Sequence, residues 1–409
     1  MGKRILILGT GAQGSTVAQR MDEEPSVDEI ICADYDERAV SELVKMLKKA
    51  KGVKVDATKT ENIVEAARGV DLIVNALPID FGKKVLDAAV EVKASYQDFA
   101  APETDEIHEV WVEGIKLMLR EYGPMFAANG RLAILGTGSA PGLIMAASRL
   151  AVKPLDTCDT IYNIVWEGVE AKRFQPFWWS PVTALSDMAG QAYAMIDGEL
   201  VRTEAFSLPI KRKYEYMDKE VEFVEHEHDE PVQIYINADT HFKGCRNAYF
   251  KYAGAGVDFA KPLYRAGLLS KKEEKVDGTK IVPFKVVLKH LPPAPKYKEE
   301  IKEIIDEGLV SDSGCMVVEA YGKKDGVDTK IEIHVFAPGL IESYERAGIT
   351  SEMYLTGQAG SLFTKLFVED VYDQTGLITS DMLTYDEIDY YFERAAELDI
   401  TLDTRIKEI

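Results

Sequence analysis

The sequence predicts an α/β protein in two parts, a parallel sheet with flanking helices and then an α+β domain with a mixed, largely antiparallel sheet. Three observations support this. Apolar β-type runs alternate with segments of helical periodicity up to about residue 155. Polar and apolar residues then alternate as in half-exposed strands. Finally, a chain of 409 residues is too long for one ordinary hydrophobic core.

The amino-acid composition argues against several classes of function. The chain has 48 basic and 69 acidic residues and a formal charge of −21, which argues against nucleic acid or an anionic membrane as a partner. The N-terminus does not resemble a secretory signal, and no apolar run reaches the roughly 18 residues that a membrane span needs. The four cysteines lack metal or redox spacing. We therefore expect a cytoplasmic protein without a structural metal.

The first predicted element carries a nucleotide-binding pattern. The apolar run RILILG ends in Gly9, Gly11 and Gly14 follow in Gly-x-Gly-x-x-Gly spacing, and helical periodicity begins at once. Gly9 permits a tight turn, Gly11 lets the backbone approach a pyrophosphate, and Gly14 lets the helix pack closely on the strand. With Ala12 and Gln13 between them, these residues predict a Rossmann dinucleotide-binding turn at a helix N-terminus. A glycine turn without a ligand is the alternative.

The second predicted strand indicates which dinucleotide binds. The run EIICAD ends in Asp34, 20 residues after Gly14, where a carboxylate accepts hydrogen bonds from the adenine ribose. Such a carboxylate repels a 2′-phosphate, so we expect NAD rather than NADP. Arg38 could turn toward a 2′-phosphate, but the sequence favours a solvated helix position for it.

Further candidate residues follow later strands. GVKVDAT (52–58), VDLIVNALP (70–78), SYQDFA (95–100) and the start of RLAILGTGSAPGL (131–143) each read as a strand, with helical segments between them. Because parallel strands present their carboxyl ends at one sheet edge, we expect a ligand cleft there. Besides the glycine turn and Asp34, the predicted cofactor-binding residues are Asp56, Asn75, Ala76, Pro78 and Gly138.

The sequence pattern changes in the second half of the chain. TIYNIVWEG (160–168), EPVQIYINAD (230–239) and CMVVEAYGKKDGVDTKIEIHVFA (315–337) read as strands, the last as a hairpin with a turn at KKDG. KHLPPAPKYKEEIKEII (289–305) reads as a proline-marked connection into a charged helix. The tail returns to helices over 358–374 and 384–400.

In their order and spacing, several segments resemble the saccharopine dehydrogenase-like family, in particular its lysine 6-dehydrogenase branch. They are GTGAQG, DLIVNALP, SYQDFA, LGTGSAPGL, WSPVTALSDMAGQAYAMIDGELV and FKYAGAGVDFAKPLYRAGLL. Two departures stand out. Ala140 occupies a position where saccharopine-forming members tend to have Asp, which favours the lysine dehydrogenase side. Lys251 and Ala255 replace the family's arginine and histidine, which points to a substrate other than lysine or saccharopine.

The resemblance implies a domain organisation. Residues 1–142 would form the Rossmann domain and 340–409 would complete it. Residues 143–339 would form an inserted domain that closes the cleft and supports dimerisation. A homodimer or a dimer of dimers is therefore expected.

The expected function is that of an NAD-dependent oxidoreductase acting on a C–N bond of an amino acid or related amine. Oxidative deamination, as in lysine 6-dehydrogenase, comes first. One alternative is reductive condensation of an amine with an aldehyde or keto acid, as in saccharopine or carboxynorspermidine formation. Another is an NAD-binding sensor without catalysis.

Catalysis needs a group that handles the amine proton. Tyr96 and Asp98 follow the strand end beyond Asn75, and we expect them to face the nicotinamide, with Asp98 binding the amine or acting as base. Alternatively, Asp98 caps the loop that follows, APETDE (101–106). The sequence leaves both interpretations open.

Substrate recognition is assigned to two segments. A substrate carboxylate needs an arginine or lysine, and KGCRNAYFKYAG offers Lys243, Arg246 and Lys251, with Tyr252 beside them; surface solvation is the alternative for at least one cation. FQPFWWSP offers Trp179 and Ser180 as a pocket wall, and core packing or a dimer contact is the alternative. HEHDE (226–230) could suggest a metal, but no third ligand is evident, so we expect a solvated charged loop.

Overall fold

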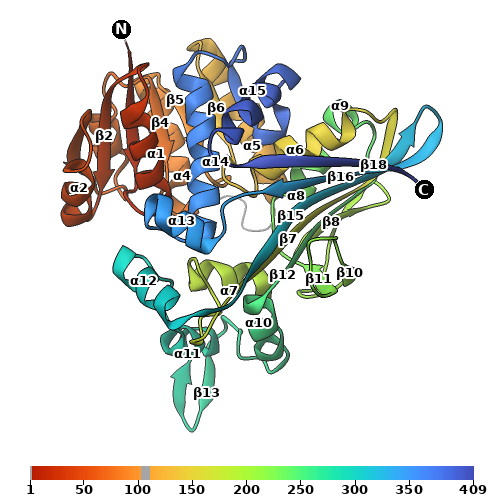
Figure 1. Ribbon diagram of the computed structural model, residues 1–409. Helices are drawn as coiled ribbons and strands as arrows, with labels where there is room; N and C mark the ends of the chain where they lie inside the picture. Colours follow the sequence, from red (N-terminus) through yellow and green to blue (C-terminus); the bar gives the residue numbers. More distant parts are fainter. Residues whose placement is uncertain (1, 103–110) are drawn as a thin grey trace. The chain divides into compact units, whose positions relative to one another are not determined.

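The computed structural model describes residues 2–102 and 111–409. The chain forms two compact units (Figure 1). Unit 1 contains Met1–Leu150 and Met353–Thr401, and unit 2 contains Ala151–Glu352 and Leu402–Ile409.

Unit 1 is a seven-stranded sheet flanked by helices. Its strands follow the order β17-β6-β5-β4-β1-β2-β3, and neighbouring strands pair in parallel, which confirms the predicted Rossmann fold. Its elements are β1 (Lys3–Leu8), α1 (Ala12–Glu23), β2 (Val27–Asp34), α2 (Glu37–Val44), β3 (Ala50–Lys54), α3 (Thr60–Ala66), β4 (Leu72–Asn75), η1 (Ile79–Phe81), α4 (Gly82–Val92), β5 (Ser95–Asp98), α5 (Trp111–Ala128), β6 (Leu132–Leu135), α6 (Leu143–Val152), α14 (Ser351–Val368), β17 (Gly376–Thr379), η2 (Ser380–Met382) and α15 (Tyr385–Ala396).

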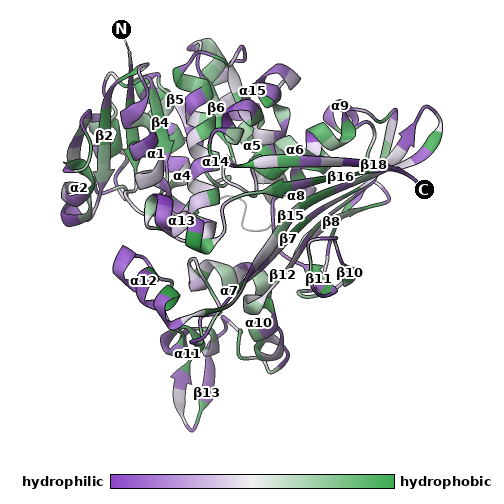
Figure 2. Cartoon of the chain, viewed as in Figure 1, coloured by the Kyte–Doolittle hydropathy of each residue, from purple (hydrophilic) through white to green (hydrophobic). Residues whose placement is uncertain are grey.

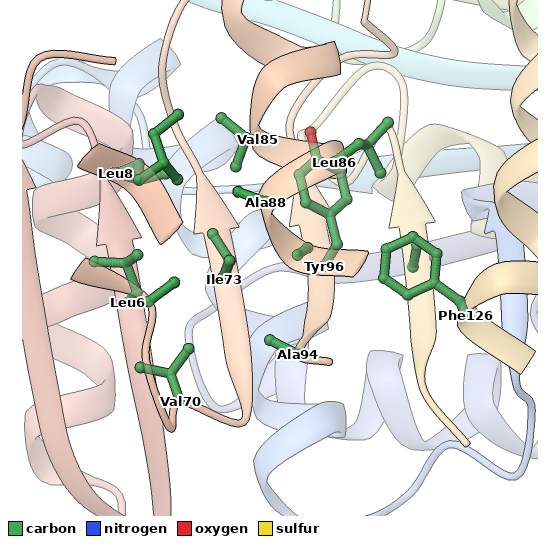
Figure 3. Packing of buried hydrophobic residues seen from close by; sticks show 14 of the residues in the cluster. Leu6, Leu8, Val70, Ile73, Val85, Leu86, Ala88, Ala94, Tyr96 and Phe126 are labelled. Atoms are coloured by element: carbon green, nitrogen blue, oxygen red, sulfur yellow. The ribbon is translucent and has the colours of Figure 1, made fainter. Parts of the chain in front are cut away.

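Apolar side chains cover both faces of this sheet. Leu6, Ile73 and Tyr96 point to one face and pack with Leu86 and Phe126 from the helices above it (Figure 3). The opposite face has its own buried cluster with α1. Strands buried on both faces read as continuous apolar runs, which is why β1 and β4 could be recognised in the sequence.

The C-terminal segment completes unit 1. Strand β17 pairs with β6 at the sheet edge. Helix α14 is tied to β5 because Gln97 donates a hydrogen bond to the Gly360 carbonyl (2.9 Å) and accepts one from the Thr364 hydroxyl (2.9 Å). Unit 1 therefore joins the first 135 residues or so and β17, which lies far along the chain, in one sheet.

Unit 2 is built on a nine-stranded mixed sheet with the order β10-β11-β12-β7-β15-β16-β18, to which β8 and β9 attach beside β12. Strand β7 pairs in parallel with β12 and antiparallel with β15. Its elements are β7 (Thr157–Ala171), α7 (Pro181–Ala189), β8 (Tyr193–Ile196), β9 (Glu199–Arg202), β10 (Ile210–Arg212), β11 (Val221–Glu225), α8 (Glu230–Ile236), α9 (Ala238–His241), β12 (Asn247–Gly254), α10 (Ala255–Arg265), β13 (Glu274–Val276), β14 (Thr279–Ile281), α11 (Pro283–His290), α12 (Lys298–Glu307), β15 (Leu309–Lys324), β16 (Val327–Phe336), α13 (Leu340–Ala347) and β18 (Thr401–Glu408).

Two sequence interpretations in this unit have different outcomes. The β15–β16 hairpin is confirmed, and its turn places Asp325 and Gly326 at φ of 52° and 78°, the left-handed region that Asp and Gly tolerate. The strand predicted over 230–239 is wrong, because Glu230–Ile236 forms α8 with Pro231 in its first turn. Residues 230–234 are all buried, so no polar face revealed the helical period.

The unit boundaries differ from the expected ones on both sides of the inserted domain, since residues 143–150 lie in unit 1. Residues 340–352 and 402–409 lie in unit 2 rather than with the Rossmann fold. Leu340 of α13 belongs to a buried cluster with Trp178 and Ile301, and β18 extends the sheet of unit 2 beyond β16. Figure 2 shows α12, which contributes Ile301, as mostly hydrophilic. No helix in the described part of the chain is long and apolar enough to cross a membrane.

Candidate functional site

The glycine turn of unit 1 requires its glycines for different reasons. Gly9 has φ of 92°, and a Cβ there would lie 2.6 Å from the Ala76 carbonyl oxygen. A Cβ on Gly14 would lie 1.9 Å from the Gly9 carbonyl oxygen, so the first turn of α1 rests directly on the end of β1. Gly9 and Gly14 are therefore needed by the fold itself.

Gly11 is different, because a Cβ there would meet nothing within 4 Å. It precedes α1, and no side chain caps the first N–H groups of this helix. Nearby, the Gln13 side-chain oxygen is buried without a hydrogen-bond partner. A dinucleotide fits this site: its pyrophosphate would occupy the space beside Gly11, and the turn would bind it through backbone N–H groups, as predicted for Gly9, Gly11, Ala12 and Gly14.

Asp34 lies at the end of β2 beside this turn. Its Oδ2 accepts hydrogen bonds from the Thr10 N–H (2.7 Å) and the Thr10 hydroxyl (3.1 Å), and Oδ1 accepts one from the Asp36 N–H (3.0 Å). The carboxylate thus holds the turn and stays half-exposed. Arg38 is exposed and pairs with Glu42 on its own helix.

The other predicted cofactor residues occupy the same sheet edge. Asn75 ends β4, and its Oδ1 accepts a hydrogen bond from the Leu77 N–H (3.2 Å), which turns the chain through Ala76 toward the exposed Pro78. Asp56 follows β3 and accepts hydrogen bonds from the N–H (3.1 Å) and hydroxyl (2.5 Å) of Thr58. Gly138 forms an isolated bridge with Gly142 in the turn after β6. Cofactor binding by these residues stays a prediction.

Tyr96 and Asp98 lie on one face of the sheet and join three strand ends. The Tyr96 hydroxyl accepts from Asn75 Nδ2 (3.0 Å) and donates to Asp98 Oδ2 (2.9 Å), while Asp98 Oδ1 accepts from the Gly136 N–H (2.7 Å). The two side chains are 1% and 2% exposed within the described residues. Burial, reinforced by the Asp98 charge, raises the pKa of Tyr96 well above its usual value.

This geometry assigns Asp98 a structural role, since it holds the turn after β6 against β5. Its predicted catalytic role stays a hypothesis. The alternative cap of the loop at 101–106 falls partly on residues 103–106, which lie outside the described residues.

In unit 2 the predicted cations have structural partners. Lys251 is 1% exposed, forms an ion pair with Glu225 and donates to the Leu208 carbonyl (2.6 Å). Lys243 donates to main-chain carbonyls, including that of Lys153 (3.1 Å), and Arg246 donates to the carbonyl of Asp197. Recognition of a substrate carboxylate by any of the three would therefore compete with these bonds.

The side chains of the predicted aromatic segment also differ in their environments, and two of them have structural roles. Trp178 is 2% exposed and donates to the Val169 carbonyl (3.1 Å), so it is a core residue. Ser180 caps α7 by accepting from the Thr183 N–H (3.4 Å). Trp179 is half-buried and donates its indole N–H to Glu167 Oε1 (2.9 Å).

Glu167 is the functional candidate that sequence reasoning missed. It lies on the same sheet face as Tyr252, whose ring is 4.5 Å from the ring of His226. Burial, reinforced by the charge of Glu352, raises the pKa of Glu167 to about 8. We call Glu167, Glu352, Trp179, Tyr252 and His226 the Glu167 cluster. Because side chains alternate along β12, Lys251 points to the opposite face from this cluster.

The expectation of a solvated loop over HEHDE is wrong. His226 is 3% exposed, and His228 stacks on Phe250 with ring centroids 3.9 Å apart. His228 also pairs with the buried Glu230 (2.5 Å). Nothing in the residue pattern distinguishes this buried segment from a surface loop, because Asp187 and Phe250, which contact it, come from other parts of the chain. Across 2–102 and 111–409, no three His, Cys, Asp or Glu side chains are placed to hold a metal ion.

Known proteins give three further findings. Residues 5–130 match the family described as the saccharopine dehydrogenase NADP binding domain. Carboxynorspermidine synthase from Vibrio alginolyticus is 24% identical over 412 residues, which span 93% of this chain and 92% of that protein. The apo histidine-tagged saccharopine dehydrogenase (L-Glu forming) from Saccharomyces cerevisiae superposes with a TM-score of 0.71 at 13% identity, over 99% of this chain and 100% of that one.

Residues 5–130 are therefore similar to the NADP-binding domain of saccharopine dehydrogenases, and the whole chain has a fold similar to that of the yeast saccharopine dehydrogenase. The fold resemblance noted in the sequence is confirmed. The matches do not separate NAD from NADP.

The open space beside Gly11 allows a test of whether the glycine turn binds a pyrophosphate. Gly11→Ala should leave the fold intact, because Gly11 has φ of −69° and its new methyl group meets no protein atom. The methyl group should weaken dinucleotide binding about tenfold or more, measured by calorimetry with NAD and NADP. Gly114→Ala, also without neighbours within 4 Å, is the matched control and should bind normally. Unchanged binding by Gly11→Ala would remove this turn from the cofactor site.

The buried Lys251–Glu225 pair gives a second test. Glu225→Ala leaves an uncompensated buried ammonium and should lower the free energy of unfolding by about 3–5 kcal/mol in urea titrations. Adding Lys251→Met should recover most of the loss, because the remaining charge is removed. If the double variant instead keeps full stability and loses only affinity for a substrate carboxylate, Lys251 is a recognition residue as the sequence suggested.

Proposed function

We propose that this protein is an NAD-dependent oxidoreductase that joins an amine to an aldehyde or keto acid by reductive condensation. The observation that carries the proposal is the similarity to carboxynorspermidine synthase over 93% of the chain. It is supported by a glycine turn whose free space at Gly11 suits a pyrophosphate. Among the functions expected from the sequence, these relatives favour condensation over lysine deamination.

The chemistry determines what the protein must provide. A neutral amine and a carbonyl compound lose water to give an imine, and one hydride and one proton added across the C=N bond give a secondary amine. A bound nicotinamide dinucleotide supplies the hydride. The chain itself must orient the amine and the carbonyl compound, hold their charges and provide the proton.

Oxidative deamination of a lysine-like amine is the second candidate. It is favoured by Ala140, which stands where saccharopine-forming members tend to have Asp. In oxidative deamination a hydride leaves the carbon of the C–N bond, and water then hydrolyses the imine. Both candidate reactions therefore act on a C–N bond.

One assay separates these functions. Purified protein is incubated with NADH and pairs of amines with aldehydes or keto acids, and separately with NAD and amines or amino acids alone. Loss of NADH absorbance only when both partners are present supports condensation. NADH formation from a single amine supports deamination. Silence in every pair, with NAD still bound in calorimetry, would leave the dinucleotide as a bound ligand without turnover and overturn the enzymatic proposal.

The preference for NAD rests on Asp34. Asp34→Asn keeps an oxygen for the Thr10 N–H but removes the charge that repels a 2′-phosphate. We expect the ratio of NAD to NADP affinity to fall about tenfold or more, as measured by calorimetry. Arg38→Gln is the companion variant and should change neither affinity. Tighter binding of NADP by the unmodified protein, lost in Arg38→Gln, would reverse the assignment.

A further inference from the structure

Two of the cysteines lie side by side in unit 2, although they are far apart in the sequence. Cys158 lies near the start of β7, and Cys245 precedes β12 by two residues. Strand β12 pairs in parallel with β7, and Asn247 lies opposite Thr160 (Figure 1). Counting back two residues on each strand places Cys245 opposite Cys158. The spacing of these cysteines along the chain therefore does not reveal a pair that the sheet brings together.

Main-chain hydrogen bonds hold the two cysteine segments against each other. The Cys158 N–H donates to the Lys243 carbonyl (3.2 Å), and the Arg246 N–H donates to the Asp159 carbonyl (3.1 Å). The Cys245 side chain lies against β7, since its Sγ is 3.7 Å from the Asp159 carbonyl oxygen. Neighbouring strands are about 4.8 Å apart, which lies within the Cα–Cα separation of about 4.4–6.8 Å that a disulfide allows.

The two thiols are buried and interact with each other. Cys158 is 4% exposed and Cys245 is 3% exposed. The pKa of Cys158 is raised, first by the neighbouring thiol of Cys245 and then by burial. Both are free thiols in the structure, and the adjoining residues Thr157 and Gly244 are exposed. The pair is therefore a protected dithiol just beneath the surface, at the ends of two paired strands.

The other two cysteines occupy different places. Cys32 belongs to β2 of unit 1 and is buried in the core of that unit. Cys315 lies on β15 opposite Trp166, eight residues along β7 from Cys158, which is about 26 Å at 3.3 Å per residue. A disulfide cannot bridge Cα atoms more than about 7 Å apart without backbone movement. Cys158 and Cys245 are thus the adjacent cysteine pair of unit 2.

We propose that Cys158 and Cys245 are a covalent modification site, at which a disulfide links β7 to β12 and stabilises unit 2. The bond closes a loop of about 90 residues that runs from β7 through α7, α8 and α9, and a cross-link across a long loop strongly restricts the unfolded chain. The two strands are already joined by hydrogen bonds, so the bond requires little change in the native fold.

A low-molecular-weight disulfide such as oxidised glutathione is the oxidant. One cysteine attacks it as the thiolate and releases one glutathione thiol. The second cysteine then displaces the other glutathione from the mixed disulfide, and the S–S bond forms. Two electrons and two protons pass from the cysteine pair to glutathione. Because the thiolate is the reacting form and the raised pKa disfavours it, the exchange is slow in the folded protein and faster while the strand ends are open during folding.

The test refolds the full-length protein from urea with reduced and oxidised glutathione. After alkylation of free thiols in denaturant, mass spectrometry of tryptic peptides should show Cys158 linked to Cys245, and Cys32 and Cys315 alkylated. This protein should melt about 5–10 °C above the same protein refolded with dithiothreitol. Dithiothreitol without denaturant should reduce the bond slowly, because both sulfurs are buried.

Variants identify the cysteines responsible. Cys158→Ala and Cys245→Ala should each lose the linked peptide and the difference in melting temperature between the two refolding conditions. Cys315→Ala is the matched control and should keep both. Comparing each variant with itself under the two conditions removes the packing cost of the substitution. If one variant fails to fold, the other variant and the peptide map of the unmodified protein still decide.

Two results would contradict the proposal. Alkylation of all four cysteines in the unmodified protein after refolding with glutathione, or any other pairing of them, would overturn the site. A linked pair whose melting temperature equals that of the reduced protein would overturn its stabilising role.

Discussion

The nucleotide-binding edge of unit 1 depends on the close approach of α1 to the end of β1. The Gly9 carbonyl oxygen lies where a side chain at position 14 would start, so only glycine lets the helix begin there. This contact places the N-terminus of α1 at the end of β1, next to Thr10, whose N–H donates a hydrogen bond to Asp34. One steric constraint thus positions the glycine turn and the Asp34 carboxylate together, as the proposed dinucleotide site requires.

The interior of the sheet stabilises that edge through polar bonds. Asn75, Tyr96, Asp98 and the Gly136 N–H form a continuous chain across the ends of β4, β5 and β6. Burying polar groups without hydrogen-bond partners costs free energy. This series of hydrogen bonds therefore holds the three strand ends in register. Residues that looked catalytic in the sequence therefore have a sufficient structural reason to be polar.

The two faces of the sheet in unit 2 carry buried ionisable groups in different environments. Lys251 and Glu225 neutralise each other on one face. On the other face Glu167 accepts a hydrogen bond from the Trp179 indole N–H, and burial raises its pKa. Lys251 therefore has a structural reason to be charged although it is buried, whereas burial disfavours the charged form of Glu167.

The sequence by itself determined the features that depend on local backbone and short-range order. Such features are the glycine spacing, the strand that ends in Asp34 and the alternation along β15 and β16. Each depends on the periodicity or the turn residues of a short segment of sequence. Only the tertiary structure decided which polar residues lie together in the interior. Glu167, Trp179, Tyr252 and Glu352 come from distant segments, and the helical state of 230–236 depends on burial by other elements. Burial and charge compensation are sums over the neighbours in space, which the order of residues along the chain does not reveal.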